Sequence, residues 1–379
     1  MTAPKPLVNA TPFHARTAGA NLHNAWTNRN GFTLSANFGD VEGEALTART
    51  CVALADISWR WRVMLEGPRA SEFLSRLATR DISRLSPGDA EKALWLNDGG
   101  AVRGAGVFAR YGRDSFLLAA AARDEDWIAT AAKSFDVTLR DRSLAEGGLA
   151  LVGPHAQQTL ISAGLDAELE PLAFRKLFWR GLDVTLSRWG EHNGYEIWCA
   201  ADDAIIVWDR LMKAGAPFAI APAGLMAMDV LDIEAGVARP GRDYDTATDG
   251  FAIWPTPRAL RLERLIDEEH KIFNGRAGWL DARDSEKYTI AGIEIDSETP
   301  APFTPLLQNG RSVGHTMSSV YSPALRRAIA LARLEAAVAE PGAVLSLTLP
   351  PGRALSQLRS AVARVTTLPF LEPPDPIMG

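Results

Sequence analysis

Cysteine is nearly absent from this 379-residue chain, which contains only Cys51 and Cys199, far apart in the sequence. Two distant thiols exclude a disulfide framework and favour a reducing compartment. Long apolar runs are missing too, and the first residues lack a charged segment followed by an apolar core. We therefore expect a cytoplasmic protein with no membrane-spanning helix and no secretory signal.

Clusters of histidine and of basic residues are also missing. The six histidines never lie four residues apart or beside a cysteine pair, so the usual patterns of a dedicated transition-metal site are absent. The net charge is −6 and no block of Lys and Arg occurs, which argues against a nucleic-acid partner. An anionic ligand must therefore be bound by individual arginines. The eleven tryptophans are typical of core residues, and some could line a pocket for a flat ligand.

The length allows two or three domains, and a repeated pattern indicates how they are arranged. The stretch VMLEGPRASEFLSRL (63–77) resembles LALVGPHAQQTLISA (149–163), each an apolar strand, then G-P-x-A, then an amphipathic helix. SFLLAAAARDEDW is likewise echoed by YEIWCAADDAIIVW (195–208), again a strand followed by an acidic helix start. The repeat predicts two related α+β halves that pack together, which we assign to residues 1–145 and 146–284.

The pattern changes towards the carboxyl end. APAGLMAMDVLDIEAG (221–236) predicts a helix that begins near Pro222 and ends at Gly236. After about residue 285, short β-like runs such as KYTIAGIEID and GAVLSLTLP are divided by Gly and Pro. We expect a small all-β domain with an irregular tail over residues 285–379.

One glycine motif is misleading. The string GAGVFA (104–109) fits the dinucleotide-binding pattern G-x-G-x-x-G/A, which requires a strand before the glycines and a helix after them. Here the glycines continue into VFARY, a GRD turn and SFLL, a hairpin pattern without a helix. P-loop, G-x-S-x-G and H-E-x-x-H motifs are absent as well. The residues alone therefore predict a soluble α+β protein and no specific chemistry.

Six stretches, in order, resemble the aminomethyltransferase family, which comprises the glycine cleavage T protein and its folate-dependent relatives. They are LTARTCVALADIS (46–58), LEGPRASEFLSRLATRDISRLSPG, LNDGGAV, NGYEIW, GLMAMDVLDIEAGVARPGRDYD and GRSVGHTMSSVYSPALRRAIALARL. Together they extend from about residue 11 to 335. The resemblance implies three domains in a ring, with a β-barrel-like third domain and tetrahydrofolate in the central opening.

Positions that match the family's motifs suggest individual roles. Glu196 matches the glutamate that binds the pterin, and a carboxylate can accept two N–H bonds from the edge of that ring. Trp254 matches a tryptophan beside the folate, and we assign Arg239 to the cofactor site as well. Asp56 is expected to support the fold. Tyr195 should point to the opposite side of the strand from Glu196 and pack in the core.

The departures from the family pattern bear on the reaction. Where the family carries a catalytic aspartate in N-x-x-G-G-x-x-D-D, this chain has Arg103 and Gly104. Met228 and Asp232 replace two family arginines. Amine release with a lipoyl-carrier partner needs that acid, whereas methyl transfer from a sulfonium or quaternary ammonium does not, because the leaving group departs neutral. An aryl methyl ether would need a proton donor or a stabilised phenolate.

We therefore expect a tetrahydrofolate-dependent methyltransferase or demethylase that acts on a small methylated compound. Arg103 and Tyr244 are the candidate catalytic residues, with Arg103 holding an anion of the substrate or a developing negative charge. Arg242 and His192 are further candidates for the pocket. We expect no nucleic-acid or membrane partner, while a homo-oligomer is possible. Two alternatives stay open: a non-catalytic folate-binding protein that assists iron–sulfur enzymes, and a folate-binding subunit of an amine oxidase.

Overall fold

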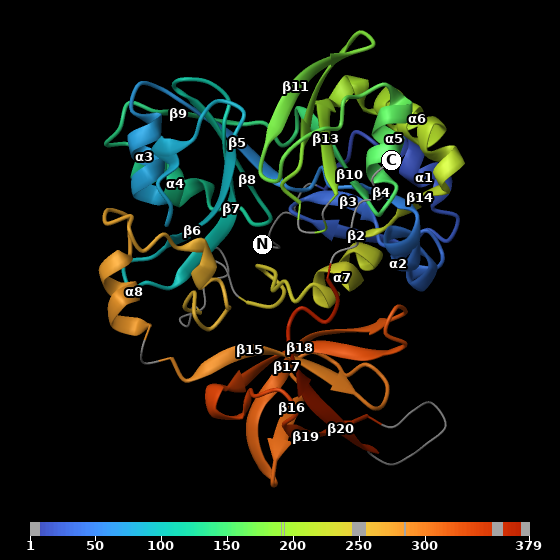
Figure 1. Ribbon diagram of the computed structural model, residues 1–379, viewed down its shortest axis with the longest axis vertical. Helices are drawn as coiled ribbons and strands as arrows, with labels where there is room; N and C mark the ends of the chain where they lie inside the picture. Colours follow the sequence, from blue (N-terminus) through green and yellow to red (C-terminus); the bar gives the residue numbers. More distant parts are fainter. Residues whose placement is uncertain are drawn as a thin grey trace, which may run out of the picture.

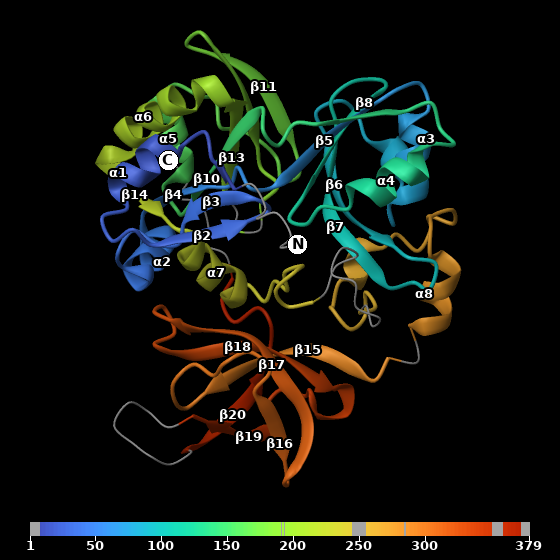
Figure 2. The ribbon, with the colours of Figure 1, turned by 180° about the vertical axis from the view of Figure 1, so that it is seen from behind.

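The computed structural model describes residues 8–190, 192, 194–244, 255–283, 286–350 and 359–372. An antiparallel sheet and a mixed sheet, each with its helices, lie side by side, and a barrel lies below them (Figure 1). The same three parts are seen from behind in Figure 2. This arrangement confirms the predicted α+β fold with a small β-barrel at the carboxyl end.

The first half is built on a five-stranded sheet in the order β6-β7-β8-β5-β9. Its strands are β5 (Trp61–Glu66), β6 (Ala90–Leu96), β7 (Val102–Arg110), β8 (Ser115–Ala120) and β9 (Thr138–Asp141). Helices α3 (Ala70–Leu77) and α4 (Glu125–Ala132) cover one face. The GAGVFA string lies within β7 and pairs with β6 and β8, so the hairpin prediction is confirmed.

The second half repeats this strand order with one insertion. Its sheet runs β11-β12-β13-β10-β4-β14. In the first half the last two strands, β5 and β9, are direct neighbours, whereas in the second half β4 is inserted between the corresponding strands β10 and β14. The strands are β4 (Val52–Asp56), β10 (Glu146–Val152), β11 (Phe174–Trp179), β12 (Leu182–Ser187), β13 (Tyr195–Ala200) and β14 (Ile220–Ala223). Helices α5 (Ala156–Ala163) and α6 (Ala204–Gly215) accompany it.

The two G-P-x-A turns show why the repeat folds alike in both halves. Gly67 and Gly153 have φ values of +149° and +132°, a region that favours glycine, and a Cβ at either position would overlap a backbone carbonyl. In each following helix the buried side chains have the same i, i+3, i+4, i+7 spacing. They are Ala70, Phe73, Leu74 and Leu77 in α3, and Ala156, Thr159, Leu160 and Ala163 in α5.

The chain before the first half contributes to the second. A small sheet β1-β3-β2 is formed by β1 (Asn9–Ala10), β2 (Trp26–Arg29) and β3 (Phe32–Ser35), and it accompanies helices α1 (His14–Ala20) and α2 (Val41–Thr50). Strand β4 then pairs with β10 and β14 of the second half. The predicted boundaries at 145 and 284 stay a prediction, and residues before Asp56 contribute a strand to the second half.

The third part is a closed barrel with the strand order β15-β18-β17-β16-β19-β20. Its strands are β15 (Tyr288–Ile295), β16 (Pro305–Gln308), β17 (Arg311–Ser322), β18 (Arg327–Glu335), β19 (Val344–Leu349) and β20 (Arg359–Thr366). Helix α7 (Leu225–Glu234) lies between the barrel and the second half (Figure 1). Its last residue, the buried Glu234, accepts hydrogen bonds from Arg49 of α2 and Ser322 of β17, each at 2.5 Å. Glu234 thereby joins all three elements.

One further α-helix precedes the barrel in the sequence. Helix α8 (Arg276–Ala282) packs beside the first half, with Trp279 buried. None of the helices among the described residues has the length and apolar character that crossing a bilayer requires. In the same residues, no group of three or more His, Cys, Asp or Glu side chains is placed to bind a metal ion.

Candidate functional site

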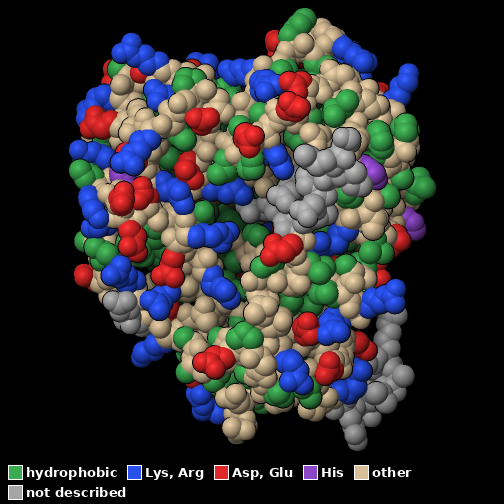
Figure 3. Space-filling model, in the orientation of Figure 1, with side chains coloured by type: hydrophobic (Ala, Val, Ile, Leu, Met, Phe, Trp, Pro, Cys, Tyr) green, Lys and Arg blue, Asp and Glu red, His purple; other side chains and the backbone are tan. Residues whose placement is uncertain are grey.

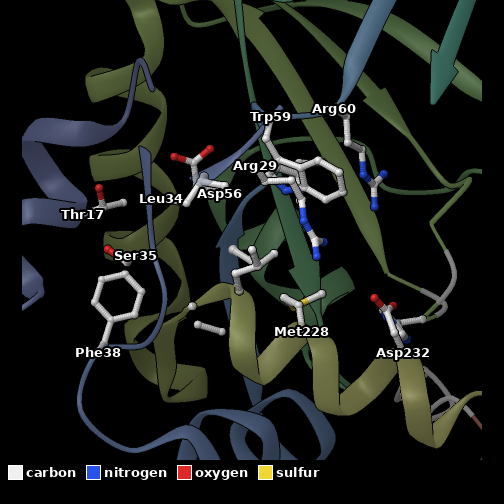
Figure 4. Close-up of a pocket in the computed structure, with 16 residues that line it drawn as sticks. Thr17, Arg29, Leu34, Ser35, Phe38, Asp56, Trp59, Arg60, Met228 and Asp232 are labelled. Atoms are coloured by element: carbon white, nitrogen blue, oxygen red, sulfur yellow. The ribbon is translucent and has the colours of Figure 1, made fainter. Parts of the chain in front are cut away.

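The face of the molecule in Figure 3 is hollowed near its centre, where apolar side chains are surrounded by Lys and Arg. A pocket with a volume of about 50 Å³ lies between the second half, the small sheet and α7. Its charged and aromatic lining comes from Arg29, Asp56, Trp59, Arg60, His192 and Asp232, together with Phe38 and Met228. In Figure 4, Arg29, Trp59 and Arg60 extend towards Met228 and Asp232 on α7.

Glu196 lies on β13, is 2% exposed, and is held by three donors. Its Oε2 accepts the indole N–H groups of Trp189 at 2.7 Å and Trp198 at 3.1 Å. Its Oε1 forms an ion pair with Arg60 Nη1. A carboxylate has about four acceptor sites, so one site on Oε1 is left for a further donor.

The neighbouring residues support the assignment of the two faces of β13. The Tyr195 hydroxyl donates to the Ala167 carbonyl at 3.0 Å within the core, on the opposite side from Glu196, as strand alternation predicts. Beside Glu196, a Cβ on Gly190 would have only Oε1 within 4 Å among the described atoms, at 3.5 Å. Oε1 is thus the side of the Glu196 carboxylate that faces Gly190.

Asp56, at the end of β4, serves the fold as predicted. Its carboxylate accepts hydrogen bonds from Thr11 Oγ1 at 2.6 Å and from the Ser58 hydroxyl and backbone N–H at 2.7 and 3.0 Å. Burial raises the pKa of Asp56 above its ordinary value. These bonds fix the turn between β4 and β5, which carries Trp59 and Arg60.

Arg103 lies where the sequence comparison placed the missing family acid. The pairing of β6 with β7 shifts here, so that Arg103 has no partner residue in the ladder, as at a β-bulge. Its guanidinium binds both oxygens of Asp124, at 2.9 and 2.7 Å, and its Cζ lies 4.5 Å from the centre of the Trp127 ring. Asp124 also accepts the indole N–H of Trp95 at 2.9 Å. The bulge thus turns Arg103 towards helix α4, and its catalytic role stays a prediction.

The next residue, Gly104, could not carry a carboxylate either. A Cβ there would overlap the ring of Trp95, which packs directly against the glycine backbone. Neither of the two positions that align with the family's D-D therefore presents an acid. Asp124, the nearest carboxylate described around Arg103, is 5% exposed and already paired.

The remaining candidates lie in a charged network after α7. Arg239 pairs with Asp229 and Asp232, and its backbone N–H donates to Asp243 at 2.9 Å. Arg242 also pairs with Asp229. Burial, aided by the nearby Arg242, lowers the pKa of Arg239 to about 9. Both arginines thus have carboxylate partners within the chain, and the proposed cofactor role of Arg239 stays a prediction.

His192 lies at the edge of this network, since its Nε2 is 2.8 Å from Asp232 Oδ1 and both side chains line the pocket. Tyr244 does not line the pocket. Its ring packs in an apolar cluster with Leu96 and Val102, and burial raises its pKa above the ordinary value. The catalytic role predicted for Tyr244 stays a prediction. Trp254 falls outside the described residues.

Sequence reasoning missed three of the residues that line the pocket: Arg29, Trp59 and Arg60. For Trp59 and Arg60 the sequence did contain a signal, because they begin the alternating W-R-W-R at 59–62, directly after the A-D-I-S stretch that resembles the family. No signal pointed to Arg29, which reaches the pocket from a strand that precedes the recognised motifs.

Comparison with known proteins decides the family. Residues 13–253 match the family described as "GCVT N-terminal domain", and residues 289–371 match the "Glycine cleavage T-protein C-terminal barrel domain". The chain belongs to the glycine cleavage T-protein family. The resemblance seen in the sequence is confirmed, and with it a role in folate-dependent one-carbon transfer with tetrahydrofolate as the cofactor.

Individual relatives agree with this family assignment. The chain is 29% identical to an aminomethyltransferase of Thermotoga petrophila over 86% of its own length and 90% of that protein. It is 29% identical to the aminomethyltransferase of Bacillus subtilis over 84% of this chain and 89% of that one. The glycine cleavage system aminomethyltransferase T from Bartonella henselae has a similar fold, with a TM-score of 0.84, 22% identity, and coverage of 97% and 99%.

The residues around Glu196 fit the cofactor of this T-protein family. A buried carboxylate with one open acceptor site on Oε1 can accept a pterin N–H. The two indoles on Oε2 hold the carboxylate in one orientation, so little freedom is lost on binding. The role of Glu196 in holding the pterin stays a prediction, and Arg60 lies beside it.

Proposed function

We propose that this T-protein family member transfers a methyl group from a small methylated compound to tetrahydrofolate. The donor is a sulfonium, a quaternary ammonium or an aryl methyl ether. Tetrahydrofolate, when bound, supplies the nucleophilic nitrogen that accepts the carbon. The single observation that supports this proposal is the bulge at Arg103, where the aligned positions of the family acid hold an arginine turned to Asp124 and a glycine covered by Trp95.

The missing acid favours methyl donors over aminomethyl donors. Release of an amine requires a proton on the leaving nitrogen, and a positioned acid usually supplies it. A methyl group on a sulfonium or a quaternary ammonium leaves with the bond's electron pair going to the sulfur or nitrogen, which becomes neutral without a proton. The protein then needs chiefly to hold the two reactants in line and exclude water.

The residues around Glu196 and the small pocket have separate roles in this proposal. Glu196 holds the pterin, and Trp189 and Trp198 hold Glu196. Arg60 bridges Glu196 and the small pocket, so the folate site and that pocket share a wall. A donor bound in the pocket would lie next to the folate, which is the arrangement that direct transfer requires.

The experiment is an anaerobic assay with tetrahydrofolate and a panel of methylated donors. The panel contains sulfonium, quaternary ammonium and methoxy-aromatic compounds, and the product is identified by mass spectrometry. We expect methyl-tetrahydrofolate with at least one class, and its loss in Glu196→Ala. Methylene-tetrahydrofolate formed from an aminomethyl donor, with no methyl product, would contradict the proposal. Folate binding with no turnover of any donor would instead favour the non-catalytic alternative.

A further inference from the structure

Arg29, the last residue of β2, reaches the small pocket without a hydrogen-bond partner among the described residues. Its guanidinium points to the side of the pocket formed by α7 (Figure 4). The carboxylate closest to it is Asp229, at 3.9 Å, which already binds Arg239 and Arg242. Arg29 therefore brings a positive charge that, among the described residues, has one long ion pair and no hydrogen bond.

The neighbours of Arg29 orient its guanidinium but form no hydrogen bond with it among the described residues. Its Cζ lies 4.8 Å from the centre of the Trp59 ring, a cation–π contact that orients the guanidinium without using its N–H groups. Burial lowers the pKa of Arg29 from its ordinary value, although nearby carboxylates partly offset this effect. An oriented planar guanidinium is suited to binding a carboxylate through two parallel hydrogen bonds.

The size of the pocket limits what can bind there. A volume of about 50 Å³ corresponds to about four water molecules. Pockets that enclose whole drug-sized ligands have roughly 300–1,000 Å³, so the enclosed space beside Arg29 suits a small group, such as a carboxylate with one or two carbons. Since Glu196 does not line this pocket, the pocket and the folate carboxylate are neighbouring sites on the two sides of Arg60.

We propose that Arg29, stacked on Trp59, binds a carboxylate of the methyl donor. This proposal deepens the proposed function and rests on it for the identity of the ligand. It narrows the donor to compounds that carry both a transferable methyl group and a carboxylate. Betaines, sulfonium carboxylates and methoxybenzoates satisfy this condition, whereas choline and anisole do not. The methyl-bearing end would extend from the pocket past Arg60 towards the folate.

The first test measures binding of the carboxylate alone and does not depend on turnover. Propionate is titrated into the wild type, Arg29→Gln and a control, Arg311→Gln, and binding is followed by saturation-transfer NMR. Arg311 suits as a control because it pairs with Glu335 on the barrel, away from the pocket. We expect saturable millimolar binding by the wild type and Arg311→Gln, and at least tenfold weaker binding by Arg29→Gln. Equal binding by both variants, or no saturable binding by the wild type, would overturn the proposal.

The second test separates the donor from the other source of carboxylate, the glutamate tail of folate. Binding of tetrahydrofolate is compared with binding of 6-methyltetrahydropterin, which lacks the tail. If Arg29 serves the donor, Arg29→Gln leaves both affinities unchanged within twofold. A tenfold loss for tetrahydrofolate alone would assign the carboxylate to the folate tail and overturn the assignment to the donor.

The third test uses turnover with matched donors, glycine betaine against choline and 3-methoxybenzoate against anisole. We expect the carboxylate member of an active pair to be preferred, and Arg29→Gln to raise its KM at least tenfold with little change in kcat. Preference for the neutral member would contradict the proposal. If no donor reacts while propionate still binds through Arg29, the proposed methyl transfer fails and the carboxylate site stands.

Discussion

Equivalent positions in the two related sheets carry Leu117 in the first half and Glu196 in the second. Leu117 pairs with Met64, and Met64 is three residues before Gly67. Glu196 pairs with Ala150, which is likewise three residues before Gly153, so the two positions correspond. Both side chains are buried, at 1% and 2% exposure. The same backbone therefore places an ordinary core residue in one half and a candidate ligand group in the other. The duplicated frame by itself specifies no function.

The buried carboxylates of the two halves give a second comparison. Asp124 in the first half and Glu196 in the second each bind one arginine and at least one tryptophan indole. Asp124 lies at the start of α4, among residues that pack between sheet and helix. Glu196 keeps one acceptor site on Oε1. Similar partners thus serve stability in one half and, we propose, ligand binding in the other.

The largest expected effect is the loss of stability on replacing Asp124, the buried carboxylate of the first half. Asp124→Ala leaves the largely buried Arg103 side chain, 13% exposed, and the Trp95 indole without the carboxylate they share. Removing one partner of a buried ion pair costs about 3–5 kcal/mol of unfolding free energy, measured by urea denaturation. The neighbouring Glu125→Ala, at an exposed position, should change stability by less than about 0.5 kcal/mol. An equally small effect of Asp124→Ala would show that the pair does not anchor the bulge.

The next effect concerns binding. Glu196→Ala should weaken tetrahydrofolate binding at least tenfold, about 1.4 kcal/mol, measured by anaerobic titration at a temperature where the variant is folded. Leu117→Ala is the matched control, because it truncates the equivalent position of the first half and should leave folate affinity unchanged. Unchanged affinity in Glu196→Ala would remove the functional difference between the halves.

The smallest effect tests the strand that only the second half contains. Because burial raises the pKa of Asp56 on β4, protonation of Asp56 favours the folded state. As the pH falls from 7 through this raised pKa towards the ordinary value of 3.8, the wild type should gain stability relative to Asp56→Asn. Unfolding free energies of both proteins are compared across this range. A difference that does not change with pH would mean that Asp56 is not strained by burial.

Much of the frame could be predicted because it depends on local signals. The G-P-x-A turns require glycine at Gly67 and Gly153, and the helices that follow have a regular apolar spacing. The barrel was indicated by short β-like runs divided by Gly and Pro. The helix expected over 221–236 forms as α7, somewhat shorter than predicted, and the acidic start at DEDW opens α4. The insertion of β4 was missed, since its partners β10 and β14 lie far along the chain.

The site was less predictable, because its chemistry depends on contacts between distant segments. Glu196 could be proposed from the N-G-Y-E-I-W motif, but its contacts with Arg60 and Trp189 could not. Arg103 was proposed as a clamp on a ligand, whereas its nearest partner is Asp124. Nothing near Arg29 in the sequence indicates that Trp59 lies beneath it.

The crossing of β4 into the second half also has a consequence for how the protein is made. Asp56 pairs with Leu149, so β4 leaves the ribosome well before the strand beside which it belongs. During synthesis the whole first half can form while β4 and the segments before it still lack their partners. A chain cut between the two halves would separate β4 from β10 for good. Expressing residues 1–145 and 146–284 as separate chains would therefore put β4 and its partner β10 on different molecules.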